Sequence, residues 1–373
     1  MRPSNIPLEQ NRKSKFLNQT LSKYPVELLH NNQIGKVYPN NWRDLSYIRP
    51  SEGSIPDVPV ENTKYVFKLT ECDGFIDQMF LKVSLTTAGD NTGMENKIGV
   101  HFFKEIVIRQ KNFIICRMNP AYIINRISEM SIDMQQNYNS LLEGTDDFNA
   151  NTVYWYIPLF CFFTDDEKNN LFLNFHKDIT VECTWNSISW VSALTGSNIS
   201  LGIVRNTYEK MYTNQLIDER KANKRYYLSY DVIPFSKDFS GTDTTLDFEL
   251  KSNYLISAIH VCGISAGKDL MDIESIQLSL GSNEVININR EEMVFYRRNE
   301  NKDIADMGTT EFSYHFGTRD DLKGHLSLLN QSALLTVNFN NIGAVSGKMW
   351  VNLEYRNVLD YTDNGEMYAT LTI

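Results

Sequence analysis

Apolar and polar residues alternate along much of this chain from about residue 61 onward. Alternation with a period of two places every second side chain on one face, which is typical of a half-buried β-strand. Turn signals such as Asp73-Gly74 separate the alternating runs. The pattern therefore predicts a mostly β fold of short antiparallel strands. The clearest runs are Tyr65, Phe67 and Leu69; Phe80, Leu81, Val83 and Leu85; Phe103, Ile106 and Ile108; and Ile179, Val181 and Cys183.

Two segments follow a helical period instead. Asn119-Pro120 has the form of an N-cap followed by a first-turn proline, and the apolar residues after it predict a helix to about Gln136. The second segment, residues 206–225, predicts a helical connector that ends in basic residues. Its apolar face and basic end comprise Tyr208, Met211, Tyr212, Gln215 and Leu216, followed by Arg220, Lys221, Lys224 and Arg225.

The part of the chain after the connector partly repeats the part before it. The apolar pattern of residues 104–115, two strands around a short turn, returns at residues 274–288. Just upstream, Phe67-Lys68-Leu69 resembles Phe248-Glu249-Leu250 in the same order. A repeat this long indicates a duplicated domain rather than a solenoid, whose units run about 20 to 50 residues. Each half suits an eight-stranded jelly-roll β-sandwich.

The length and charge of the chain limit the number of domains and the classes of function to consider. The chain has 373 residues and a mass of 43.1 kDa, enough for two domains. Its net charge of −10 argues against nucleic-acid binding by the whole surface. The first 25 residues are an exception, because they contain one acid and read as a flexible basic arm. The basic residues of this arm are Arg2, Arg12, Lys13, Lys15 and Lys23.

Cysteine usage and hydropathy indicate a protein that is made in a reducing compartment and is not secreted. The five cysteines are widely spaced, without CxxC pairs, and are expected to be buried free thiols. The start of the chain lacks the apolar core of a signal peptide, and no stretch reaches the roughly 18 consecutive apolar residues of a membrane span.

Candidate catalytic and binding motifs have simpler structural interpretations. Residues 263–267 fit the G-x-S-x-G pattern around Ser265, but no helix is expected after them, so a strand-end turn is favoured over a nucleophile elbow. His176 and His260 are expected to be satisfied strand positions, since the six histidines show no metal-ligand spacing. The acids Asp146-Asp147 and Asp165-Asp166-Glu167 suit solvated loops. The aromatic residues Trp155, Trp185, Trp190, Phe160, Phe162 and Phe163 suit core packing rather than a sugar platform.

Several stretches, in order, resemble the major capsid proteins of nucleocytoplasmic large DNA viruses and their smaller relatives. Residues 154–181 are similar to the family stretch "W-x-IPLPFFF … LPL-x-x-L-x-Y-H-x-V-x-I". Residues 126–144 resemble the family's helical excursion, residues 324–327 its "PSG-x-x-N-F-S" region, and residues 355–365 its "Y-N-x-L-R-I-x-x-G" terminus. Cys161 stands near the family's second proline, and the short chain implies short outer loops, as in virophage, polinton-like or adintovirus capsids.

The resemblance implies a double jelly-roll coat protein with no catalytic activity and no cofactor. Such a chain would form a homotrimer with a pseudo-hexagonal outline and tile an icosahedral virion shell, assembled in the host cytoplasm or nucleus. A penton protein and minor capsid proteins are implied partners, and the arm would meet a neighbouring capsomer, an internal membrane or the genome. Candidate assembly residues are the basic residues of the arm, Tyr208, Tyr212 and the basic cluster of the connector, and Tyr355 and Asn357 in the carboxyl-terminal segment.

The expected division of the chain is an amino-terminal arm and lead-in (1–60), a first jelly roll (61–205), a helical linker (206–225) and a second jelly roll (226–373). Two other functions stay open at this point. One is a carbohydrate-binding or carbohydrate-cleaving β-sandwich of the fibre or lectin type. The other is a double jelly-roll scaffold that is absent from the mature virion.

Overall fold

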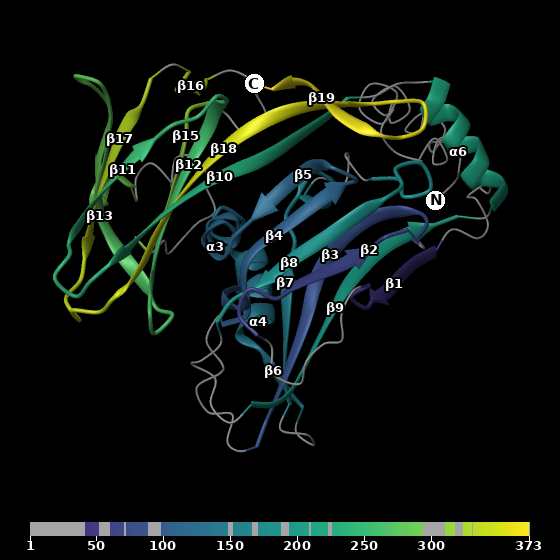
Figure 1. The fold of residues 1–373 in the computed structure, drawn as a ribbon, viewed down its shortest axis with the longest axis horizontal. Coiled ribbons are helices and arrows are strands. Elements are labelled where there is room, and N and C mark those ends of the chain that lie inside the picture. The colour runs from purple at the N-terminus through teal and green to yellow at the C-terminus, as the bar shows by residue number, and fades with distance from the viewer. Residues whose placement is uncertain are drawn as a thin grey trace, which may run out of the picture.

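The computed structural model is mostly β and contains two jelly rolls joined by one helix (Figure 1). It describes residues 42–51, 60–70, 72–88, 98–147, 152–165, 171–187, 194–208, 210–222, 226–293, 310–317, 324–329 and 331–372. The expected basic arm, with Arg2, Arg12, Lys13, Lys15 and Lys23, lies outside the described residues.

The first roll consists of two antiparallel sheets. One has the strand order β1-β9-β3-β7-β6, and the other has the order β2-β8-β4-β5. Apolar side chains alternate along these strands, so each sheet turns one face into a shared core. The bounds are β1 Trp42–Ile48, β2 Lys64–Lys68, β3 Phe75–Thr87, β4 Phe103–Gln110, β5 Phe113–Met118, β6 Thr145–Asp147, β7 Thr152–Pro158, β8 Ile179–Trp185 and β9 Leu194–Thr207.

The second roll is built in the same way. In one sheet β10 pairs with β18, β18 with β12, and β12 with β15; in the other β11 pairs with β17, β17 with β13, and β13 with β14. The bounds are β10 Tyr227–Phe239, β11 Thr245–Leu250, β12 Leu255–Ser265, β13 Leu270–Leu280, β14 Asn283–Asn289, β15 Glu311–His315, β16 Leu326–Ser327, β17 Ala333–Asn340, β18 Gly347–Tyr361 and β19 Met367–Thr372.

The two rolls share one strand order, which confirms the duplication inferred from the sequence. Strands β1, β2, β3, β4, β5, β7, β8 and β9 occupy the places that β10, β11, β12, β13, β14, β15, β17 and β18 occupy in the second roll. The two segments that were matched by pattern are the hairpins β4–β5 and β13–β14. The prediction of two tandem eight-stranded jelly rolls, with a helical excursion in the first and a helix between them, is therefore confirmed.

The helical excursion differs from the single helix expected up to Gln136. It forms α3 (Pro120–Ser128) and α4 (Ile132–Glu143), separated by a short break. Asn119 caps α3 as expected, because its side chain accepts a hydrogen bond from the Tyr122 amide. Helix α3 ends before Glu129, whose carboxylate contacts His260 and His315 of the second roll. Two short helices, a 3-10 helix over Ile98–Phe102 and α5 over Phe162–Asp165, complete the first roll.

The boundaries of the first roll extend beyond the expected ones. Strand β1 lies within the segment assigned to the lead-in, and it pairs with β9 from Trp42↔Thr207 to Ile48↔Leu201. Strand β9 runs to Thr207, and the connecting helix α6 spans Lys210–Ala222 rather than the whole of residues 206–225. We therefore place the start of the first roll at β1.

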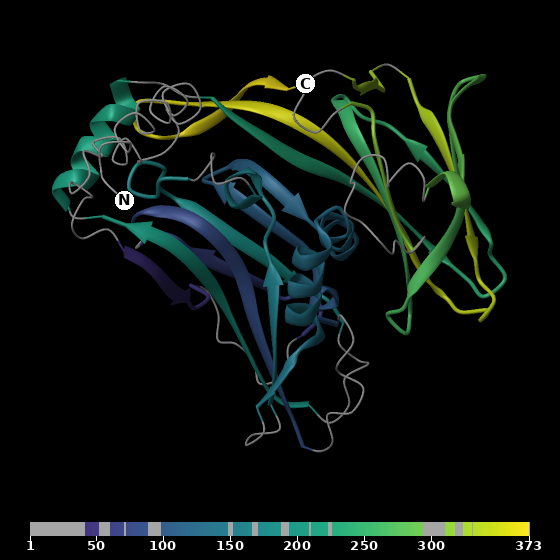
Figure 2. The ribbon, with the colours of Figure 1, turned by 180° about the vertical axis from the view of Figure 1, so that it is seen from behind.

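The rolls pack tightly against each other. Strands β10 and β18 are long, and both views show them running from the second roll across the first toward α6 (Figures 1 and 2). Second-roll residues such as Cys262, Ile264, Leu359 and Tyr361 belong to the hydrophobic core of the first roll. The outer face of the β10-β18-β12 sheet is thus covered by the first roll. We call this contact the joint.

Candidate assembly surfaces

A buried polar cluster occupies the centre of the joint. His260 on β12 is fully buried, and its ring nitrogens lie 3.4 Å from Glu129 at the end of α3 and 3.4 Å from Glu354 on β18. His315 on β15 contacts Glu129 at 3.1 Å, and Arg126 of α3 contacts Glu129 at 3.2 Å. The cluster joins an excursion of the first roll to three strands of the second, so it aligns the two rolls.

The charges of this cluster compensate one another. Burial alone would lower the pKa of His260, but the carboxylates of Glu129 and Glu354, each 3.4 Å from a ring nitrogen, outweigh it and raise that pKa to about 9. Burial likewise opposes ionisation of Glu354, yet His260 and Arg126 hold its pKa below the ordinary value. Tyr122 also donates a hydrogen bond to Glu354 at 3.0 Å. The joint therefore buries a cation between two carboxylates at neutral pH.

Amide and carboxylate groups extend the joint on both sides of the cluster. The Asn119 amide donates to the Asn352 side-chain oxygen at 2.5 Å, and Asn125 donates to the Val261 carbonyl at 3.3 Å. Asp231 on β10 accepts a hydrogen bond from the Arg117 amide at 2.8 Å. Buried polar groups need such partners, so each bond fixes the relative position of the rolls.

The carboxyl-terminal hairpin, β18 to β19, is clamped onto the first roll. The Gly365 carbonyl accepts hydrogen bonds from Gln110 at 2.9 Å and from the His176 ring at 2.9 Å. The Met367 amide donates back to Gln110 at 2.6 Å. Gly365 has a φ of +80°, and a Cβ there would lie 2.1 Å from the Phe175 carbonyl oxygen. The position therefore requires glycine for two separate reasons.

The predicted assembly residues fall into three groups. Tyr355 and Asn357 are buried within the chain; Tyr355 donates a hydrogen bond to Asp231 at 2.7 Å and stacks on Tyr254. Tyr208 packs against Phe75 of the first core, and Lys221 is exposed on α6. Tyr212 is half-buried on α6. The side chain of Arg220, and residues Lys224 and Arg225, lie outside the described part, as does the arm.

A different surface, not singled out from the sequence, is exposed and aromatic. On the outer side of the β1-β9-β3-β7 sheet, a set of mostly apolar side chains projects away from the core, and we call it the aromatic face. Lys82 lies over the rings of Tyr154 and two further tyrosines, 4.7 to 5.7 Å from their centroids. Leu45 and Tyr47 are each 48% exposed. The aromatic face consists of Leu45, Tyr47, Phe80, Lys82, Tyr154 and Tyr156.

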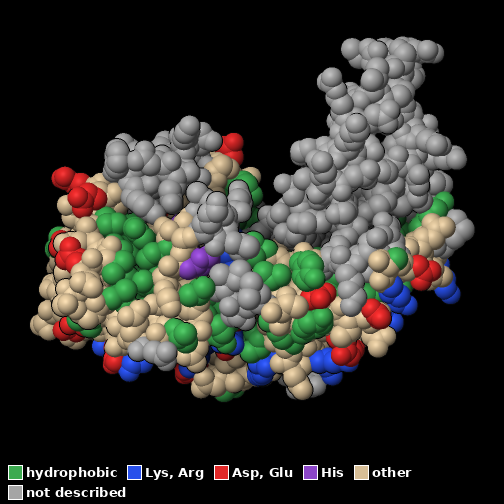
Figure 3. Space-filling view, turned by 90° about the horizontal axis from the view of Figure 1, so that it is seen from above, with side chains coloured by type: hydrophobic (Ala, Val, Ile, Leu, Met, Phe, Trp, Pro, Cys, Tyr) green, Lys and Arg blue, Asp and Glu red, His purple; other side chains and the backbone are tan. Residues whose placement is uncertain are grey.

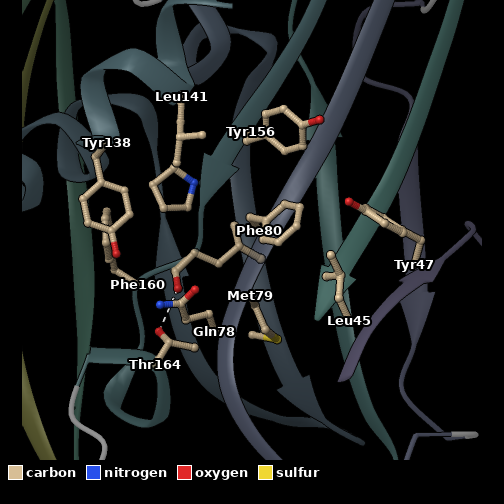
Figure 4. Close-up of a pocket in the computed structure, with 12 residues that line it drawn as sticks. Leu45, Tyr47, Gln78, Met79, Phe80, Tyr138, Leu141, Tyr156, Phe160 and Thr164 are labelled. Carbon is tan, nitrogen blue, oxygen red and sulfur yellow. Dashed lines mark hydrogen bonds between the residues drawn. The ribbon is translucent and has the colours of Figure 1, made fainter. Parts of the chain in front are cut away.

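The aromatic face is hollowed beside helix α4. A pocket of about 300 Å³ lies between this helix and strands β1 and β3 (Figure 4). Tyr138 and Leu141 line it from the helix, and Phe80 and Tyr47 line it from the sheet. The alternation of Arg43, Leu45 and Tyr47 on β1 was the sequence signal for this surface, but it precedes the region where the β pattern was recognised.

The catalytic alternatives find little support in the geometry. Ser265 ends β12, and its hydroxyl accepts a hydrogen bond from the Asp269 amide in the turn to β13; no helix follows, as expected for a strand-end turn. His176 is hydrogen-bonded to Gly365 and Tyr227, though it lies in a bend rather than in a strand. Asp146 and Asp147 lie in β6 rather than in a loop, and Asp165 ends helix α5, while Asp166 and Glu167 lie outside the described residues.

The aromatic side chains weighed as a sugar platform are buried. Trp155 and Trp185 are almost fully inaccessible, and Phe102 packs between them with ring centroids 4.9 and 5.6 Å away. Phe160, Phe162 and Phe163 belong to the same core, while Trp190 lies outside the described residues. The described aromatic residues of this set therefore pack the core.

Three further observations bear on chemistry. The five cysteines are free thiols; four are buried, and Cys72 is half-buried. Within the described ranges, three or more metal-ligand side chains do not come together. The helices of the described part are too short or too polar to cross a membrane.

Seen from above, the surface mixes acidic and hydrophobic side chains, while Lys and Arg gather along one rim (Figure 3).

The fold has counterparts among solved structures of viral capsid proteins. PBCV-1 VP54, as fitted into a reconstruction of the virophage Sputnik, matches with a TM-score of 0.69 at 11% identity, covering 89% of this chain and 98% of that one. The Faustovirus major capsid protein matches with a TM-score of 0.62 at 7% identity, covering 94% and 98%. The mavirus major capsid protein matches with a TM-score of 0.54 at 12% identity, covering 88% and 90%.

Two comparisons by sequence found no match. No protein-family model matches the chain, and no curated protein matches it. At identities of 7 to 12% the structural matches establish the fold. The chain therefore has the double jelly-roll fold of these major capsid proteins over about nine-tenths of its length.

Proposed function

We propose that this chain is the major capsid protein of an icosahedral DNA virus of the nucleocytoplasmic large DNA virus, virophage and polinton-like lineage. The observation that carries the proposal is the fold: two jelly rolls of one strand order, matched almost end to end by viral major capsid proteins. The sequence resemblance over residues 61–373 points to the same lineage.

The proposed working unit is a homotrimer with a pseudo-hexagonal outline. Two similar rolls in one chain give three chains six similar sides, so a closed threefold ring can pack in a hexagonal array. The rolls of this chain are fixed to each other by a buried polar joint and a clamped carboxyl-terminal hairpin. A rigid two-roll unit supports the proposal because six similar sides are kept only if the rolls do not move relative to each other.

The protein acts by self-association in this proposal and carries out no reaction. The G-x-S-x-G motif forms a hairpin turn, and the candidate aromatic platform is core. We propose that the chain resides in the virion shell and meets a penton protein and minor capsid proteins there. The basic arm of residues 1–25 is proposed to contact an internal membrane or the genome, because its charge is opposite to that of the chain as a whole.

Size-exclusion chromatography with light scattering tests the proposal on the full chain. The expected mass is three times 43.1 kDa. A stable monomer that binds glycans would contradict the proposal in favour of a carbohydrate-binding sandwich. A trimer found in immature particles but absent from purified virions would contradict it in favour of a scaffold.

A further inference from the structure

The two rolls have equivalent surfaces, but only one pair of these surfaces meets within the chain, at the joint. The duplication therefore predicts that the remaining pair, which has no partner among the described residues, can form a similar contact. In the joint, the first roll presents α3 and the edge strand β5 to the outer face of the β10-β18-β12 sheet. The equivalent outer face in the first roll belongs to β1, β9 and β3 and is the aromatic face. Nothing within the described chain covers Leu45 and Tyr47 on that face, each 48% exposed.

The other half of the missing contact is exposed as well. Strand β14 is the equivalent of β5, the edge strand that the first roll presents to β10. Of the two edge strands, β5 is buried at Ile115, Cys116 and Met118, whereas β14 is exposed at most positions, including Val285 at 40%. In the described part, the first roll therefore exposes the aromatic face, and the second roll exposes the β14 edge. These two surfaces are the equivalents of the two that meet in the joint.

We propose that the aromatic face of one chain binds the β14 edge of the second roll of a neighbouring copy. This inference rests on the proposed trimer and identifies its interface. The contact is head-to-tail: each chain offers one face and one edge, and the two differ. Heterologous contacts of this kind close into a ring when the rotation between copies allows it. A closed ring of three chains requires a rotation of one third of a turn at each contact.

The composition of the aromatic face suits such a contact. Interface cores are enriched in tyrosine and phenylalanine and depleted in charge. Among the six residues of the aromatic face the formal charge is that of Lys82, which lies among three tyrosine rings, and Arg43 beside them is paired with Asp77. The pocket beside α4 is lined by Leu45, Phe80 and Leu141 and is open for an apolar side chain. Exposed Glu284, Glu291 and Glu292 on and after β14 are opposite in charge to Lys82.

A matched pair of leucines provides the first test. Leu45→Asp places a charge on the aromatic face and is expected to convert the trimer into monomers at micromolar concentration in light scattering. The control is Leu334→Asp, because Leu334 is equally exposed, at 49%, on β17, which is separated from the β14 edge by strand β13. It should stay trimeric. Circular dichroism and melting curves check that both variants are folded.

Mixing two variants tests the direction of the contact. Val285→Asp should also give monomers, because it damages the edge. In a one-to-one mixture, the intact edge of Leu45→Asp chains can bind the intact face of Val285→Asp chains, so dimers should form and rings should not close. Two results would overturn the inference while leaving the proposed function intact: wild-type trimers with trimeric Leu45→Asp, or monomers only in the mixture. A monomeric wild type would instead overturn the proposed function.

Discussion

At the scale of single residues, the joint depends on charges that were brought together from distant parts of the sequence. His260 lies between Glu129 and Glu354 and also contacts Ser313 at 2.8 Å. Its raised pKa means that folding favours the protonated ring. This stabilisation is fully present below the ordinary histidine pKa of 6.5 and is lost as the pH rises through about 9.

We therefore expect the melting temperature to fall by at least a few degrees between pH 7 and pH 10. His260→Gln should be less stable at pH 7, because two buried carboxylates lose their shared cation, and its melting temperature should change less over the same range. His325→Gln is the control, since its pKa is lowered and it does not titrate in this window. Calorimetry at a fixed protein concentration measures the effect. An unchanged pH dependence in His260→Gln would contradict this assignment.

Gly365 gives a second test at this scale. Gly365→Ala must adopt a φ of +80° and also meet the Phe175 carbonyl, so the hairpin clamp should loosen. Gly281→Ala carries the backbone cost alone, because Gly281 has a φ of +58° with open space around it. We expect about 1 kcal/mol of destabilisation for Gly281→Ala and at least twice as much for Gly365→Ala in urea denaturation. Equal losses would show that the clamp does not constrain Gly365.

At the scale of elements, the sequence predicted strands well where alternation was regular and a turn residue followed. The hairpins β4–β5 and β13–β14 and the N-cap at Asn119 were found in this way. The break at Glu129 could not be predicted, because local periodicity continues through it to Met134. The break is set by partners in the second roll, and His315 is 186 residues away from Glu129.

The candidate surfaces were harder to predict than the elements, for a related reason. Tyr355 and Asn357 alternate with Arg356 in a segment near the chain end, so nothing local marks them as buried. Their burial follows because β18 lies between β10 and β12 and contributes residues to the core of the first roll. The aromatic face becomes a surface only when β1, β3 and β7 pair through β9 and each other. The pairing of β9 with β1 and β3 joins residues more than 100 positions apart, which periodicity does not reveal.

The N-cap of α3 gives a prediction about the stability of this helix. Asn119→Ala removes the hydrogen bond to the Tyr122 amide and leaves buried Asn352 without a partner, so it should cost about 2 kcal/mol or more. Ser131 is the matched control, because it precedes α4 as the N-cap without a side-chain hydrogen bond. Ser131→Ala should cost less than about 0.5 kcal/mol. Urea denaturation compares them, and similar losses would contradict the role given to Asn119.

At the scale of the whole molecule, the duplication is the feature on which the proposed hexagonal packing depends. The two rolls keep one strand order although their loops, helices and surfaces have diverged. The first roll carries the helical excursion that fills the joint, and the second carries the clamped hairpin that returns to the first. Each roll thus contributes one half of the contact that holds the pair together.

The central claim is that three of these two-roll chains form a closed ring in which first and second rolls alternate. Single-particle electron microscopy of the purified full chain tests it most directly. The account predicts a threefold particle with six jelly rolls around its axis, in which the aromatic face of each chain meets the β14 edge of the next. A monomer, or a ring in which like rolls face one another, would contradict it.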